Sequence, residues 1–284
     1  MKRALRKIFK YMPDRLVMQI DNLRTYGRFL NLNNPKFYGE KIQWIKAYGR
    51  LERFTSLVDK YLVRDLVKEK IGEEYLPKII SIYDDVNEIN YKVLPNKFVL
   101  KINDGSDKNI ICKDKSLLDT EETNKTLRKL FNEDYYKYTK EPQYRNIKKK
   151  IICEEYLENK NGELIEYGLH CFSGRAQLVE VHTGRYKDYR EDYYNSNWTR
   201  LSLGGKAKSS LKDFEKPIFL ENLIKLSEKL AKGFEYIRVD FNAVDEKLYF
   251  SELTFTPSNG TDKFKPIEED LRLAKLIDLK KYNK

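Results

Sequence analysis

Residues 236–256 read YIRVDFNAVDEKLYFSELTFT, and more of the architecture follows from them than from any other part of the chain. Apolar and polar residues alternate on both sides of the Asp-Glu-Lys sequence at positions 245–247. This pattern predicts two antiparallel strands joined by a three-residue loop. Such a loop pairs Val244 with Leu248, and that pairing sets the register of the rest of the hairpin.

The predicted register places two carboxylates opposite each other. Asp240 faces Glu252, and one pair further along Arg238 faces Thr254. All four side chains project from one face of the hairpin because side chains alternate along a strand. Opposed positions lie about 4.5–5.5 Å apart at Cβ, where like charges are destabilising. Two such carboxylates need a shared proton or a shared cation such as Mg²⁺, which prefers carboxylate and phosphate oxygens. The pattern alone leaves open an exposed hairpin whose opposed charges have no role.

Length and composition are those of a globular protein. The chain has 284 residues, 40% hydrophobic and 13% aromatic, enough for one large domain or for two to three lobes. No apolar run approaches the roughly 20 residues that cross a bilayer, and no secretory signal follows the N-terminus, so we expect a cytoplasmic protein. The cysteines Cys112, Cys153 and Cys171 lie in or beside apolar runs and are expected to be buried thiols. The only histidines, His170 and His182, belong to no zinc-like grouping.

The formal net charge of +11 indicates an anionic partner. The lysines are spread along the chain, and no helix-turn-helix, RNP or zinc-finger signature is present, so we expect no nucleic-acid partner. Nucleotide triphosphates, acidic sugars and anionic lipid surfaces fit the charge equally well. Residues 1–12, MKRALRKIFKYM, have an apolar stripe among basic residues. This is typical either of peripheral membrane contact or of a helix docked on its own protein.

Three further segments have clear patterns. Residues 55–70 have the apolar spacing of a helix, with Lys60 and Arg64 four positions apart on one face. Residues 94–112 predict a strand, a loop with one glycine, and a returning strand. The backbone N–H groups of such a loop can bind phosphate, although glycine is also common in ordinary hairpin turns. A helix is expected over residues 217–232.

Several motifs together resemble the ATP-grasp enzymes, and most closely their TupA-like branch, which is associated with teichuronopeptide and other cell-surface polysaccharide synthesis. The resemblance covers about residues 35–264. No single motif is decisive, but their order and spacing are specific. The motifs are EKIQW (40–44), DKYLVRDLV (59–67), IGEEYLP (71–77), LPNKFVLKINDGS (94–106), ICEEYLE (152–158), RVDFN (238–242) and FSELTFTPSNG (250–260).

The resemblance implies an ATP-grasp fold, an α/β architecture in which two α+β lobes grip ATP and Mg²⁺. The implied domains are an N-terminal helical segment at residues 1–54, a first lobe at 55–155, and a second lobe at 156–284 that contains the hairpin. The implied activity is that of a ligase. ATP activates a carboxylate as an acyl phosphate, and an amine then attacks to form an amide.

The resemblance also implies roles in ATP binding. Lys60 is expected to reach the α-phosphate region, and Lys101 the α- and β-phosphates. The loop at residues 104–107, with Gly105 and Ser106, is expected to close over the triphosphate. The segment between the lobes is expected to bind adenine and, through its last residue, the ribose; it comprises Glu154, Glu155, Tyr156, Leu157 and Glu158.

In the same way, Asp240 and Glu252 correspond to the Mg²⁺ ligands. Arg238 corresponds to the arginine that steadies the transferred phosphoryl group, so Arg238 and Lys101 are the expected catalytic residues. The sequence departs from the family pattern at two positions. Position 107 is Asp where relatives often have Gly, and position 254 is Thr where many ATP-grasp ligases have a metal-binding Asn. Metal ligation through Thr254 is therefore not expected.

The substrates implied by this branch are a uronic acid of a surface polysaccharide or its precursor, and an amino acid or other amine. Arginine forks suit carboxylates, so the candidate binders of the substrate are Arg175, Arg185, Lys187 and Arg190. Two alternatives remain open from the residues. A glycosyltransferase or sugar kinase of the same pathway would give Lys101 and Arg238 no role. A non-enzymatic basic module that binds nucleic acid or lipid would leave Asp240 and Glu252 unexplained.

Overall fold

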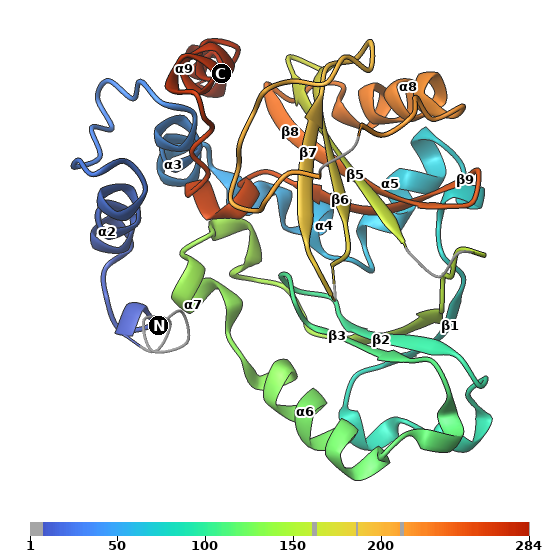
Figure 1. The fold of residues 1–284 in the computed structure, drawn as a ribbon. Helices are drawn as coiled ribbons and strands as arrows, with labels where there is room; N and C mark the ends of the chain where they lie inside the picture. The colour runs from blue at the N-terminus through green and yellow to red at the C-terminus, as the bar shows by residue number, and fades with distance from the viewer. Residues whose placement is uncertain (1–7, 161–163, 186, 211–212, 284) are drawn as a thin grey trace.

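The hairpin of β8 (Tyr236–Val244) and β9 (Lys247–Thr254) forms one edge of a five-stranded sheet. The computed structural model, which describes residues 8–160, 164–185, 187–210 and 213–283, contains this sheet and a second sheet of four strands. Figure 1 shows the four-stranded sheet below the five-stranded one, with helices packed around both. The two layers of antiparallel strands and helices confirm the α+β-lobe architecture expected from the sequence.

The four-stranded sheet has the order β1-β4-β2-β3, and its neighbouring strands are antiparallel. Phe98 and Ile151 are fully buried in its core, together with Leu127 of helix α6. The loop after β2 leads back into β3 and corresponds to the predicted glycine loop. The bounds are β1 Ile79–Tyr83, β2 Phe98–Ile102, β3 Asn109–Cys112, β4 Ile151–Glu155, α6 Thr120–Asn132 and α7 Tyr135–Thr139.

The five-stranded sheet has the order β7-β6-β5-β8-β9. The remaining bounds are β5 Ile165–Phe172, β6 Arg175–Thr183, β7 Arg190–Tyr194 and helix α8 Leu220–Ala231, the helix expected over residues 217–232. Helix α8 packs against β5, β6 and β8 and buries Leu223, Leu226 and Leu230 in the core. Because side chains alternate along a strand, Arg238 and Asp240 lie on the face away from α8.

The N-terminal and C-terminal helices pack together beside the five-stranded sheet (Figure 1). They are α2 (Asp14–Tyr26), α3 (Tyr38–Tyr48) and α9 (Ile267–Lys275). The backbone N–H of Tyr38, at the start of α3, donates to Asp270 of α9 at 2.8 Å. Short helices α4 (Thr55–Val58) and α5 (Val63–Lys70) also bury side chains in the core of this sheet. The limits of the three predicted domains stay a prediction.

The helix expected over residues 55–70 is interrupted, and that expectation was wrong in one respect. Helix α4 ends at Val58, and α5 begins at Val63. Between them the Asp59 carboxylate accepts hydrogen bonds from the backbone N–H groups of Tyr61 (2.8 Å) and Leu62 (3.2 Å), which competes with the helical pattern. Lys60 therefore lies in a turn and not on a helix face shared with Arg64.

The hairpin differs from the prediction at its tip and agrees with it further along. Its turn has two residues, so Val244 pairs with Lys247 and not with Leu248. A one-residue shift by itself would move every side chain of β9 to the other face. An irregularity between Asp240 and Phe241 adds one residue on β9 and restores the predicted register, so that Asp240 pairs with Glu252.

The structure also bears on the expectations about the cysteines, about membrane-spanning helices and about the N-terminal segment. Cys112, Cys153 and Cys171 are buried and free, as predicted. Across the described ranges, no helix has the length and apolar character needed to span a bilayer. Residues 1–7 of the proposed membrane-contact segment lie outside the described residues. Phe9 of that segment is buried against Val17, so it contributes to the protein core.

The packing of α8 predicts a large loss of stability on truncation. Leu223 is 0% exposed, so Leu223→Ala leaves a cavity and should lower the free energy of unfolding by about 2–5 kcal/mol. The matched control is Ile218→Ala, since Ile218 is 77% exposed and its truncation should change stability by less than about 0.5 kcal/mol. Urea unfolding measures both. Equal effects of the two substitutions would contradict the described packing.

Candidate active site

The paired carboxylates are compensated by two cations from different parts of the chain. Arg238 donates from Nε (2.7 Å) and Nη2 (3.0 Å) to the two oxygens of Asp240. Lys60 Nζ lies 3.2 Å from Glu252 Oε2. Thr254 Oγ1 lies between the two carboxylates, 3.0 Å from Asp240 and 3.3 Å from Glu252. The arrangement keeps two like charges on facing positions because each has its own counter-charge.

The two carboxyl groups differ in their affinity for protons. Burial raises the pKa of Asp240 above its usual value, with Arg238 opposing the rise and Glu252 adding to it. Burial would also raise the pKa of Glu252, but Lys60 and Arg238 lower it below the usual value. Glu252 is therefore ionised at neutral pH, whereas the charge of Asp240 depends on its pairing with Arg238.

Gly168 of β5 makes room for this arrangement. It pairs with Asp240 across the sheet. A Cβ atom at position 168 would lie 2.9 Å from Asp240 Oδ1 and 3.0 Å from Arg238 Cδ. A side chain there would displace the Arg238–Asp240 pair, so the site depends on glycine at this position.

Lys60 also connects the hairpin to the glycine loop of the other sheet. Its Nζ donates to the carbonyl oxygen of Gly105 at 2.6 Å. Gly105 has φ +69°, and a Cβ there would lie 2.3 Å from the ring of Tyr135, so this position also requires glycine. Ser106 Oγ lies 3.1 Å from the Tyr135 hydroxyl. Asp107, which replaces the family's second glycine, adopts φ +59°, a conformation that Asp tolerates better than most residues.

The residues expected around the nucleotide form a second charged group. The buried side chain of Glu154 lies between two cations, 2.6 Å from Lys101 and 3.1 Å from Arg64. The Glu155 side chain accepts from the backbone N–H of Lys78 at 2.8 Å. Beyond β4 the chain leaves the sheet. There the ring of Tyr156 lies 5.9 Å from Lys97 Nζ and 5.9 Å from Lys113 Nζ, Glu158 pairs with Lys97 at 2.5 Å, and Leu157 is half-buried.

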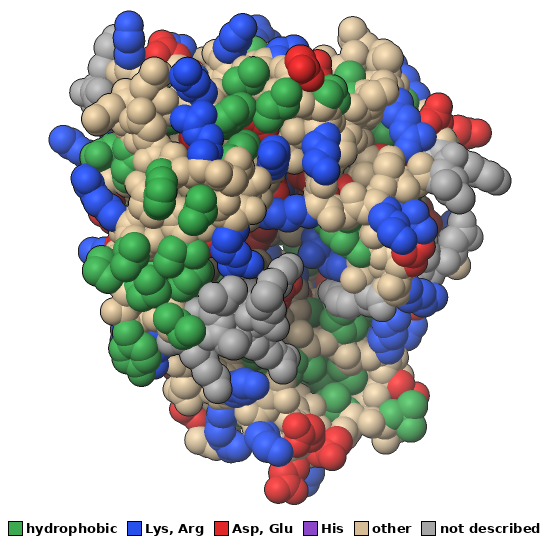
Figure 2. Space-filling view, turned by 60° about the vertical axis from the view of Figure 1, so that its left-hand side comes forward, with side chains coloured by type: hydrophobic (Ala, Val, Ile, Leu, Met, Phe, Trp, Pro, Cys, Tyr) green, Lys and Arg blue, Asp and Glu red, His purple; other side chains and the backbone are tan. Residues whose placement is uncertain are grey.

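Of the four candidate substrate residues, Arg185 lies nearest the carboxylate pair. It is bonded through Nε to Glu166 at 2.5 Å, and its charge helps to lower the pKa of Glu252, after burial and the larger effects of Lys60 and Arg238. The other three lie elsewhere: Arg175 pairs with Glu228 of α8 at 3.0 Å, Arg190 with Asp188 at 2.5 Å, and Lys187 is exposed. Figure 2 shows a hollow on one face of the molecule with Lys and Arg side chains at its border.

A family model described as TupA-like ATPgrasp matches residues 40–278. The chain belongs to the TupA-like ATP-grasp family. As a member of this family it is an ATP-dependent ligase. No curated protein matches.

Solved structures similar to this TupA-like ATP-grasp chain are distant in sequence. A D-alanine–D-alanine ligase from Bacillus anthracis is 18% identical with a TM-score of 0.46, over 80% of this chain and 67% of that one. The D-alanine–D-alanine ligase from Helicobacter pylori is 16% identical with a TM-score of 0.47, over 85% and 69%. The ATP-grasp ligase PsnB, complexed with minimal precursor, Mg and ADP, is 10% identical with a TM-score of 0.41, over 77% and 58%.

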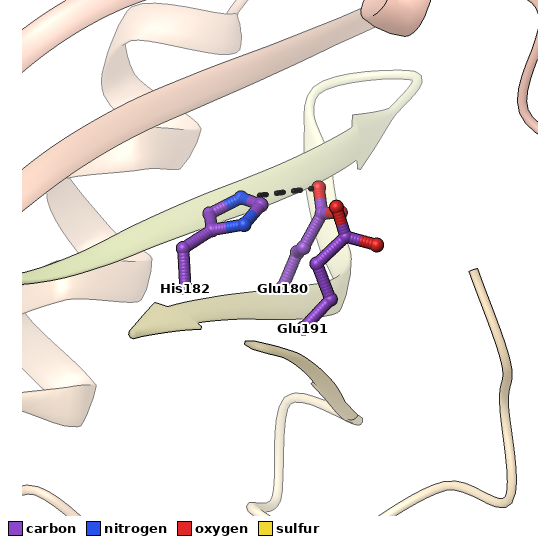
Figure 3. A group of neighbouring side chains, drawn as sticks. All are labelled: Glu180, His182 and Glu191. Atoms are coloured by element: carbon purple, nitrogen blue, oxygen red, sulfur yellow. Dashed lines mark ion pairs between the residues drawn. The ribbon is translucent and has the colours of Figure 1, made fainter. Parts of the chain in front are cut away.

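The sequence did not predict a second polar group on the same face of the five-stranded sheet. Glu180 and His182 of β6 and Glu191 of β7 have ligand atoms within 4.8 Å of one another (Figure 3). Glu180 also accepts from Arg238 Nη1 at 3.2 Å, which joins this group to the carboxylate pair. His182, which belongs to no zinc-like grouping in the sequence, thus lies beside two carboxylates in the structure. Glu180 and His182 alternate with valines as in any half-buried strand, and Glu191 lies between two other charged residues, so only the pairing of β6 with β7 identifies the group.

A buried acid near Glu252 makes stability depend on pH. Burial raises the pKa of Glu141 to about 7, although Thr256 and Lys46 oppose the rise. In the unfolded chain a glutamate has a pKa of about 4.3, so the folded state binds an extra proton between these values. The contribution of Glu141 to stability should therefore decrease as pH rises from about 4.5 to about 7.

Glu141→Gln removes this titration and keeps a polar side chain. The free energy of unfolding of the variant, minus that of the wild type, should increase over this pH range by an amount on the order of 2 kcal/mol. Urea unfolding at several pH values measures the difference. Glu246→Gln, in the exposed hairpin turn, is the control and should show no such trend. A pH-independent difference for Glu141→Gln would contradict a protonated Glu141 in the folded protein.

Proposed function

We propose that this chain joins a carboxylate to an amine through an acyl phosphate, with a uronic acid of a cell-surface polysaccharide or its precursor as one substrate. The observation that supports the proposal most is the common face of Arg238, Asp240 and Glu252, connected through Lys60 to the Gly105 loop. A triphosphate placed between this loop and this face would have cations on both sides. Its γ-phosphate would then lie nearest Arg238.

On the nucleotide side, Lys101 and Lys60 would bind the phosphates as flexible point charges. Both lysines are paired with carboxylates in the structure, Lys101 with Glu154 and Lys60 with Glu252. The backbone N–H groups at Gly105 and Ser106 would close over the phosphates. Residues 154–158 would contact the adenine and ribose, because they lie where β4 leaves the first sheet for the second.

The donor set on the hairpin fits Mg²⁺. Asp240 and Glu252 come from facing positions on adjacent strands and supply hard oxygen ligands, and a metal ion would add to the stabilisation that Arg238 gives Asp240. When bound, Mg²⁺ neutralises charge that develops on the β- and γ-phosphates. Arg238 is held by Asp240 and Glu180, so its guanidinium is oriented before the substrate arrives. An oriented guanidinium can stabilise charge that appears only in the transition state.

The substrates are inferred from the chemistry of the site and from the family. Attack of a carboxylate on the γ-phosphate breaks the bond between the γ-phosphorus and the β–γ bridging oxygen and releases ADP. The acyl phosphate then reacts with the amine, which forms the C–N bond and releases phosphate. The carboxylate belongs in this proposal to the uronic acid, with the amino acid as amine; the reverse assignment fits the same geometry. Arg185, beside Glu166, would bind a substrate carboxylate.

Nucleotide binding can be tested without knowing the substrates. Mg²⁺ and ATP at 100 times Kd should stabilise the protein by about 2.7 kcal/mol, seen as a rise in Tm. Lys101→Met should reduce that rise, and the control Lys92→Met, an exposed lysine of the same sheet region, should not. The absence of a Tm rise with any adenine nucleotide and Mg²⁺ would argue strongly against the proposal.

The reaction can be tested by trapping the acyl phosphate. Hydroxylamine, with Mg²⁺, ATP and a glycan that contains glucuronate or galacturonate, should yield a hydroxamate and ADP. Acyl phosphates react with water, so we expect the Gly105 loop to close and exclude solvent before transfer. The natural amine should compete with hydroxylamine. Formation of AMP and pyrophosphate, or of ADP only with a hydroxyl substrate, would refute the ligase chemistry proposed here.

A further inference from the structure

The polar face of the five-stranded sheet continues from the carboxylate pair to the opposite edge of the sheet. Glu252, Asp240 and Gly168 pair in one row across β9, β8 and β5. The same row continues through Glu180 of β6 to Tyr193 of β7. Since Gly168 has no side chain, the row is open between Asp240 and Glu180, and Arg238 bridges the two.

A neighbouring row adds a histidine with a defined tautomer. His182 pairs with Glu191 of β7 on one side and with Glu166 of β5 on the other. The Tyr189 hydroxyl lies 2.7 Å from His182 Nδ1 and 2.8 Å from Glu191 Oε1. The hydroxyl has one proton, and a carboxylate can only accept, so the proton goes to Glu191 and Nδ1–H of His182 donates to Tyr189. Nε2 is then the nitrogen of His182 that gains and loses a proton.

Nε2 lies close to the Glu180 carboxylate. The distance to Glu180 Oε2 is 3.6 Å, longer than a direct N–H···O hydrogen bond. The charged groups around the ring are Glu180 on its own strand, Glu191 on β7, Glu166 with its partner Arg185 on the β5 side, and Arg238 on β8. Burial would lower the pKa of His182, but Glu180 raises it above the usual value, so Nε2 is a stronger base than a free imidazole.

Resting on the proposed function, we propose that Glu180, His182 and Glu191 bind the protonated amino group of the nucleophilic substrate, and that His182 Nε2 accepts its proton. The ammonium ion would donate to the two carboxylates and to Nε2. Loss of one proton to Nε2 frees the nitrogen lone pair, which forms the C–N bond as the bond from the acyl carbon to the phosphate oxygen breaks. The phosphate leaves with that electron pair and takes the second proton of the amine.

An ammonium ion fits this group better than a divalent metal. Glu180 Oε2 already lies 3.2 Å from Arg238 Nη1 and 3.2 Å from His170 Nε2. The group offers three acceptors, the Glu180 and Glu191 carboxylates and His182 Nε2, whose ligand atoms lie within 4.8 Å of one another. An ammonium ion has one charge and three N–H donors.

The test uses the fact that the chain has only two histidines. Selective ¹⁵N labelling of histidine gives two sets of ring signals, which His182→Gln assigns. Ethylammonium chloride, added without nucleotide, should shift the Nε2 signal of His182 saturably. Tetramethylammonium chloride has the same charge but no N–H and should not shift it. Glu191→Gln should weaken ethylammonium binding at least tenfold, and the control Glu228→Gln on α8 should not.

Because no nucleotide is present, this result is independent of whether the protein forms an acyl phosphate. An Nε2 signal that does not respond to ethylammonium, or responds equally to tetramethylammonium, overturns the proposal. So does Mn²⁺ that broadens the His182 signals selectively at concentrations well below those at which ethylammonium acts, since the group would then be a metal site. A response of the wild type that Glu191→Gln leaves unchanged overturns the role of Glu191.

Discussion

The structure depends on the compensation of two facing carboxylates. Asp240 and Glu252 are held together by the pairing of β8 with β9, and neither can move away without breaking that ladder. Arg238 compensates one of them and Lys60 the other. Because Lys60 comes from a distant part of the sequence, the electrostatics of the hairpin also help to position the turn between α4 and α5. Burial raises the pKa of Asp240 although Arg238 is bonded to it, so a metal ion would stabilise its charge further, and this is the physical reason for placing Mg²⁺ there.

Lys60 is the residue that connects the two sheets at this point. It reaches Glu252 on one sheet and the carbonyl of Gly105 on the loop of the other. Its position in a turn follows from Asp59, which accepts from the following backbone N–H groups and from the amide of Asn103 at 2.8 Å. A lysine in a continuous helix would be fixed by that helix alone. In the turn, the backbone N–H of Lys60 also donates to the carbonyl oxygen of Asn103 at 3.0 Å. This hydrogen bond positions the end of α4 relative to the loop that follows β2.

The sequence was sufficient where the pattern is local. Alternation predicted the hairpin, and the facing of Asp240 and Glu252 is confirmed, although two errors cancelled: a turn shorter than predicted at the tip, and an added residue on β9 beside Glu252. The helix break at Asp59 was missed because the spacing of apolar residues gives no information on hydrogen bonds between a side chain and nearby backbone N–H groups. Glu180, His182 and Glu191 were missed because strand pairing brings them together, and strand order cannot be read from alternation. For the same reason only Arg185, among four candidate substrate residues, lies near the carboxylate pair.

The central claim is that Asp240 and Glu252 hold the metal of the ATP complex beside Arg238. Anomalous diffraction from crystals grown with Mn²⁺ and a non-hydrolysable ATP analogue tests it most directly, because Mn²⁺ takes the oxygen ligands that suit Mg²⁺. The account predicts an anomalous peak between the Asp240 and Glu252 carboxylates, in contact with the analogue's phosphates. A peak at Glu180, His182 and Glu191 with none at the hairpin would contradict it, as would a triphosphate bound away from Arg238.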